Sequence, residues 1–87
     1  MFVILAYDVG EKRVSKVAKK VKKFLFPVQR SLYQGFITEA KLKKLKKEVD
    51  SVIDKSSDSI IIYKLNDENT LRFEEIGISK ISENYIL

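Results

Sequence analysis

The residue best suited to chemistry in this sequence is Asp8, which ends an unbroken apolar run over residues 2–7. Such a run, followed by Gly10, predicts a strand in the middle of a sheet with both faces covered. A carboxylate at the carboxyl end of a strand lies where open α/β sheets place their functional groups. Carboxylate oxygens are ligands that Mg²⁺ prefers, so Asp8 is a candidate metal ligand. The alternative is that Asp8 caps the helix that follows.

The composition restricts this chemistry further. The 87 residues include neither cysteine nor histidine. This excludes disulfides and cysteine-based zinc or redox sites, and it removes the commonest general base. Gly10, Gly35 and Gly77 are isolated, so the sequence has no glycine loop of the kind that cradles phosphates in ATPases and dinucleotide enzymes.

Positive charge is concentrated in one part of the chain. Residues 1–47 carry 13 Lys and Arg against three acids, a net +10, whereas residues 48–87 carry four against nine, a net −5. This polarity indicates a polyanionic partner such as nucleic acid. The alternative is a pair of solvated lysine-rich helices, as proteins from hot environments often have. The first helix offers these candidate nucleic-acid contacts: Lys12, Lys16, Lys19 and Lys20.

A single carboxylate makes a poor metal site, and the other acids in residues 1–47 are Glu11 and Glu39. A two-fold homodimer would bring two copies of Asp8 to one interface, because such contacts repeat each residue. A metal beside a basic surface then predicts phosphodiester binding, with hydrolysis by a metal-activated water as the further step.

The elements that must position these residues follow from hydrophobic spacing. An apolar stripe predicts a helix over residues 11–25, which Pro27 ends. Residues 28–37 are extended, with a break at 29–31. A second amphipathic helix over 39–54 begins with a hydroxyl cap at Thr38, and a buried strand covers 59–65.

Residues 70–78 form a weaker strand, and the apolar tail that follows is expected to dock on this chain or a partner. The order is β-α-β-β-α-β with an extra C-terminal strand, which predicts one α+β domain over residues 1–87 with ferredoxin-like topology. The RNA-recognition module shares this topology, but Tyr33 and Phe36 are predicted on opposite strand faces and its basic-glycine-aromatic signature is missing.

The longest apolar run is far shorter than the roughly 20 residues that a membrane helix needs. The N-terminus also lacks the basic region of a signal peptide. We therefore expect a cytoplasmic protein with no membrane partner.

Four stretches together resemble the CRISPR-associated protein 2 family. They are Tyr7-Asp8 at the end of the first strand, Arg13-Val14 at the start of the helix, Val28-Gln29-Arg30-Ser31-Leu32-Tyr33-Gln34-Gly35, and Asp58-Ser59-Ile60-Ile61-Ile62-Tyr63. The resemblance covers almost the whole chain. Many members have a basic residue just before the Val-Gln pair, where this chain has Pro27, so one phosphate contact is not expected here.

The resemblance implies a homodimer whose last strand, within residues 70–87, crosses to the partner's sheet. It implies a Mg²⁺-dependent endonuclease for RNA or double-stranded DNA, with Mn²⁺ as another possible metal, acting beside the CRISPR-associated integrase in spacer acquisition. Carried over by motif, Asp8 is the metal ligand and catalytic residue, and Arg13 and Arg30 contact phosphate. The residues that line the site are Tyr7, Ser31 and Tyr33.

Three other functions remain open at the level of sequence. The chain could be a non-catalytic scaffold dimer that binds duplex DNA and bridges integrase subunits. It could be a small metal-free interaction domain whose basic helices are incidental. A toxin-type ribonuclease of the virulence-associated protein D kind has the same fold and is the other nuclease candidate.

Overall fold

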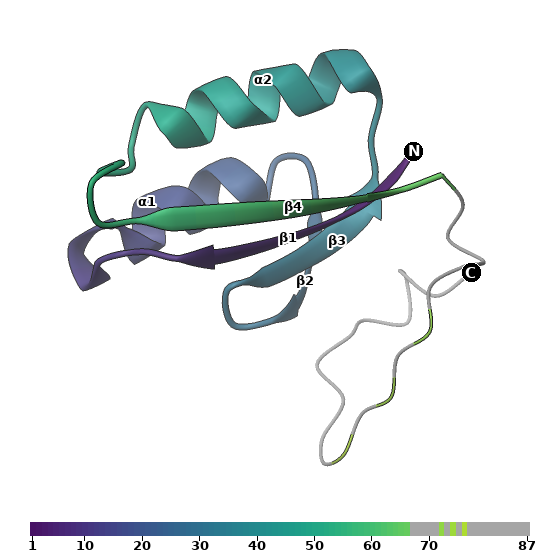
Figure 1. Cartoon of the computed structure of the whole chain (residues 1–87), viewed down its shortest axis with the longest axis horizontal. Coiled ribbons are helices and arrows are strands. Elements are labelled where there is room, and N and C mark those ends of the chain that lie inside the picture. Colours follow the sequence, from purple (N-terminus) through teal and green to yellow (C-terminus); the bar gives the residue numbers. More distant parts are fainter. Residues whose placement is uncertain (67–71, 73, 75, 77–87) are drawn as a thin grey trace.

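The computed structural model of the chain describes residues 1–66, 72, 74 and 76. Its elements follow the predicted order (Figure 1): β1 (Phe2–Asp8), α1 (Glu11–Val21), β2 (Phe26–Gln29), β3 (Leu32–Phe36), α2 (Glu39–Asp50) and β4 (Ser59–Leu65). The predicted C-terminal strand over 70–78 and the tail after it lie outside the described residues, apart from positions 72, 74 and 76.

The four strands form one antiparallel sheet in the order β2-β3-β1-β4. Both helices lie on the same side of this sheet (Figure 1). This arrangement is the ferredoxin-like split βαβ architecture, and it confirms the predicted fold class. It also confirms that the first apolar run is an interior strand.

The prediction that β1 is covered on both faces is wrong for the described residues. Val3, Leu5 and Tyr7 point into the core between sheet and helices and are at most 8% exposed. Ile4 and Ala6 alternate with them, are only half-buried, and face away from the helices. We call the sheet face opposite α1 and α2 the open face. An apolar run can therefore signal a one-sided core plus a second, less covered apolar surface.

The core is a single cluster between the sheet and the two helices. From α1 it takes Val17 and Val21, and from α2 it takes Leu42, Leu45 and Val49, all at most 3% exposed. Their spacing gives each helix one apolar stripe, which fixes the helix faces that carry lysine outward.

The helices differ from their predicted lengths at their C-terminal ends. Helix α1 stops at Val21, and the chain then turns so that the amides of Phe24 and Leu25 both donate to the Val21 carbonyl, at 3.0 and 2.9 Å. Pro27 follows within edge strand β2, where a missing amide is tolerated. Leu25 is thereby buried as part of a turn, which helical spacing alone does not distinguish from a last helical turn.

The predicted cap of α2 is confirmed, because the Thr38 hydroxyl accepts a hydrogen bond from the Lys41 amide at 3.2 Å. The predicted break at residues 29–31 is also confirmed, since β2 ends at Gln29 and β3 begins at Leu32. No helix within the described part of the chain combines the length and apolar character needed to cross a bilayer.

Candidate functional site

Asp8 is exposed at the carboxyl end of β1, opposite Ser59 of β4. It follows Ile4 and Ala6 in the strand alternation, so its side chain belongs to the open face. The interpretation of Asp8 as a helix cap is wrong. Gly10 is the N-cap of α1, and no side chain makes a capping hydrogen bond there.

The open face beside Asp8 is apolar and partly uncovered. Phe36, Tyr63 and Ile61 are 60%, 56% and 49% exposed, and strand pairing places them on the same face as Ile4. Phe36 packs edge-on against Phe2, with ring centroids 5.1 Å apart. Asp8 therefore lies at the end of an apolar surface.

Among the residues of the four described strands, Asp8 is the one carboxylate that could bind a metal. Among the described residues, no three acidic side chains gather into a group that could hold a metal ion. Mg²⁺ does not require such a cage, because it binds through one or two carboxylates and completes its coordination with water and phosphate oxygens. Asp8 thus fits Mg²⁺ as a partial site, to which a second carboxylate must come from elsewhere.

The predicted site residues Tyr7, Arg30, Ser31 and Tyr33 line one pocket of about 390 Å³. Tyr7 and Tyr33 belong to the helix-covered side of the sheet, opposite the open face that carries Asp8. The structure therefore brings these four residues together but separates their pocket from the Asp8 carboxylate by the thickness of the sheet. The remaining lining residues are Lys22, Pro27, Val28 and Gln29. Two cations and no acid line this pocket, which favours an anionic occupant.

The turn between β2 and β3 is fixed to β1 by a backbone hydrogen bond, in which the Tyr7 amide donates to the Ser31 carbonyl at 3.0 Å. Ser31 adopts the left-handed conformation, with φ of 63°. A residue with a Cβ is uncommon there and often marks a functional site.

Tyr7 and Tyr33 stack with ring centroids 6.1 Å apart. Burial, with a smaller contribution from the neighbouring Tyr7, raises the pKa of the Tyr33 hydroxyl to about 12. Tyr33 therefore keeps its proton throughout the neutral range.

The predicted cations fall into two groups, those with an acidic side chain in ion-pair range and those without one. Arg13 makes an ion pair with Asp58, and the Lys20 ammonium lies 3.7 Å from Glu48, which also binds Lys23. Within residues 1–66, by contrast, four predicted cations have no acidic side chain in ion-pair range: Lys12, Lys16, Lys19 and Arg30. Lys12, Lys16 and Lys19 share one exposed face of α1 by their spacing.

Two residues of the site are not apparent from the sequence. Lys22 is one of many lysines on α1 and its end, although it lines the tyrosine pocket. Asp58 belongs to a family motif that suggests no role for it, although its side chain is fully buried against Arg13. The signal for Asp58 is a lone acid directly before the apolar run that forms β4. The prediction that this strand is buried is wrong, because β4 is an edge strand and none of its residues is buried.

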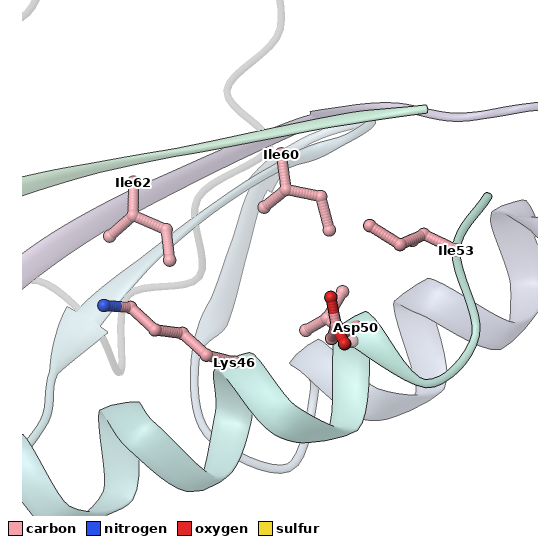
Figure 2. A pocket seen from close by; sticks show the side chains of 6 residues that line it. Lys46, Asp50, Ile53, Ile60 and Ile62 are labelled. Atoms are coloured by element: carbon pink, nitrogen blue, oxygen red, sulfur yellow. The ribbon is translucent and has the colours of Figure 1, made fainter. Parts of the chain in front are cut away.

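A second hollow, of about 260 Å³, lies between α2 and edge strand β4 (Figure 2). Ile53, Ile60 and Ile62 give it an apolar wall, and Lys46 and Asp50 of α2 flank it. It contains none of the predicted site residues.

Comparison with known proteins gives consistent relatives. A family model described as CRISPR associated protein Cas2 matches residues 1–72. CRISPR-associated endoribonuclease Cas2 of Thermotoga maritima is 38% identical over 86 residues, 99% of each chain. CRISPR-associated endoribonuclease Cas2 3 of Thermodesulfovibrio yellowstonii is 44% identical over 79 residues, which are 91% of this chain and 90% of that one. The crystal structure of Streptococcus pyogenes Cas2 at pH 6.5 superposes with a TM-score of 0.79 at 31% identity, covering 88% of this chain and all of that one.

The buried Tyr33 hydroxyl predicts an alkaline transition. Below pH 10.0, the ordinary pKa of tyrosine, Tyr33 favours the folded state fully. That contribution is lost as the pH rises towards about 12, because the unfolded chain releases the proton first. Ultraviolet titration of the folded protein should show a late tyrosinate component that Tyr33→Phe removes. An unchanged titration curve in that variant would contradict the assignment.

Proposed function

This chain belongs to the CRISPR-associated protein Cas2 family, and on that premise we propose that it is a Mg²⁺-dependent endonuclease for RNA or double-stranded DNA in CRISPR spacer acquisition. The observation that carries the proposal is Asp8, an exposed carboxylate at the end of the central strand. Relatives named as endoribonucleases support RNA as a substrate.

Different residues of the chain would bind the metal and the nucleic acid. Asp8 from each of two copies would hold the metal and orient it, since Asp8 is the one carboxylate among the residues of the four described strands. Bound there, Mg²⁺ would supply an activated water and neutralise charge on the scissile phosphate. Mn²⁺ accepts the same oxygen ligands.

The cationic face of α1 would bind the phosphate backbone. Lys12, Lys16 and Lys19 lie within eight residues of helix, an axial rise of about 10 Å at 1.5 Å per residue. A row of cations of this length can contact successive phosphates of one strand. Arg30, which has no acidic side chain in ion-pair range within residues 1–66, would add a contact at the β2–β3 turn.

A homodimer through the open face would complete the site. The exposed side chains of Phe36, Ile61 and Tyr63 form an apolar surface that water disfavours. Asp8 lies on this same face, so a two-fold pairing there would bring the two carboxylates to one interface. The CRISPR-associated integrase would bind this dimer, which spans the nucleic acid between integrase subunits.

Asp8→Asn should abolish cleavage of RNA or duplex DNA while leaving folding and binding unchanged, because the amide is isosteric but a poor metal ligand. Wild-type cleavage should stop on chelation and return with Mg²⁺. Asp50→Asn, an exposed acid of α2, is the matched control and should cleave normally. Unchanged cleavage by Asp8→Asn would overturn Asp8 as the catalytic residue, whereas lost cleavage with spacer acquisition intact would favour the non-catalytic scaffold.

Replacing Lys16 and Lys19 with Gln should weaken nucleic-acid binding uniformly across sequences. The plot of log affinity against log salt should flatten by about one unit for each phosphate interaction that the substitutions remove. Lys64→Gln on β4 is the control, with the same kind of charge change away from α1. Equal weakening per charge for both sets would mean that net charge, rather than the α1 face, governs binding.

Ile61→Asp combined with Phe36→Asp should shift the protein from dimer to monomer in analytical ultracentrifugation, because a charge placed in an apolar interface loses its hydration. Cleavage should fall with dimer content. A variant that stays dimeric would exclude the open face as the interface.

A further inference from the structure

Asp58 is the most completely engaged side chain of the described residues. Its side chain has no solvent exposure. One carboxylate oxygen accepts from the Gly10 amide at 2.8 Å and from Arg13 Nη2 at 3.0 Å. The other accepts from Arg13 Nε at 2.5 Å and from the Asp54 amide at 2.8 Å. Each oxygen thus takes one guanidinium and one backbone donor, which uses the acceptor capacity of an ionised carboxylate.

These contacts join three segments that are remote in sequence: the turn after β1, the start of α1, and the loop before β4. The loop is itself closed, since the amides of Ser57 and Asp58 donate to the Asp54 carbonyl. The Arg13 guanidinium holds the pKa of Asp58 well below its ordinary range, so the pair is charged at neutral pH.

The anchored positions flank Asp8. Asp8 pairs with Ser59 across β1 and β4, and the residue before Ser59 is Asp58. Two residues after Asp8, Gly10 donates to that same Asp58 carboxylate. The backbone that carries Asp8 is therefore held in two places, by Ser59 across the sheet and by Gly10 along the chain. Ser59 follows Asp58 directly, and Gly10 donates to the Asp58 carboxylate.

The close packing at Gly10 points the same way. A Cβ built at position 10 would lie 2.5 Å from Arg13 Nη2 and 3.1 Å from Arg13 Cζ. The guanidinium thus lies directly over the backbone of the turn. A side chain at position 10 would therefore force the guanidinium out of its present position.

We propose that the Arg13–Asp58 pair, packed over Gly10, is an internal anchor that positions Asp8, and that Arg13 is a positioning residue rather than a phosphate contact. The inference rests on the proposed function for its effect on cleavage, but the anchor itself does not depend on it. Two of the guanidinium nitrogens, Nε and Nη2, already bond to Asp58, and Nη2 also reaches the Ser57 hydroxyl at 3.5 Å.

The test compares Arg13→Gln, Asp58→Asn, their double variant and Gly10→Ala in the full-length protein, each shown to be folded by circular dichroism. Nucleic-acid binding is measured against salt in chelator, where cleavage cannot interfere. We expect affinity and salt slope to match the wild type in all four. Arg30→Gln is the control with the same chemical change at a predicted phosphate contact, and it should flatten the slope by about one unit.

A second readout is amide hydrogen exchange at Gly10 and Asp54, the two backbone donors to Asp58. Exchange should accelerate by about tenfold or more in both single variants. The double variant should show little further change, because both substitutions remove one unit. The double variant also avoids leaving Asp58 buried without a cation, should Arg13→Gln fail to fold.

For cleavage, the anchor variants should lose about 10- to 100-fold in kcat with KM unchanged, the expected result of misplacing a reacting group. A flattened salt slope in Arg13→Gln, or tighter binding in Asp58→Asn through release of Arg13, would overturn the anchor and leave the nuclease intact. Absence of cleavage in the wild type, with faster Gly10 exchange in the variants, would overturn the nuclease and leave the anchor intact. Unchanged exchange at Gly10 would overturn the anchor directly.

Discussion

Side-chain alternation along β1 is the constraint on which the rest of the structure depends. Because successive residues of a strand point to opposite faces, Tyr7 enters the core and Asp8 faces away from it. Both helices cover the Tyr7 side of the sheet (Figure 1), so the site divides into a tyrosine pocket on the helix side and an exposed carboxylate on the open face. A one-residue shift in register would exchange these two environments. The interior position of β1, hydrogen-bonded to β3 and β4, prevents that shift.

The topology is predictable from the sequence because period-two and period-3.6 patterns alternate clearly and Thr38 marks the start of α2. The sequence does not reveal that β1 has helices on one face only, since Ile4 and Ala6 have the same apolar character as Val3 and Leu5. The sequence pattern also predicts the end of α1 at the wrong residue, because Phe24 and Leu25 continue the helical spacing although they belong to a turn. Both errors arise where tertiary packing, rather than local preference, decides the outcome.

The candidate site is predictable as a set of residues but not as an arrangement. Tyr7, Arg30, Ser31 and Tyr33 are identified from motifs and lie around one pocket. Arg13 is identified in the same way, yet its partner Asp58 lies 45 positions further along the chain. No local pattern indicates such a pairing. It depends on β4 returning beside β1, so the role of this charged residue is visible only when the strand order is known.

The conformation of Ser31 has a consequence for engineering this protein. A left-handed backbone at a residue with a Cβ is a local cost that glycine would remove. A search for stabilising substitutions would therefore select glycine at this turn. The exchange would remove the hydroxyl from the rim of the pocket that Ser31 shares with two tyrosines and two cations. Thermostability and the proposed role of Ser31 in lining the site thus make opposite demands on this one position, and a design that optimises either alone would compromise the other.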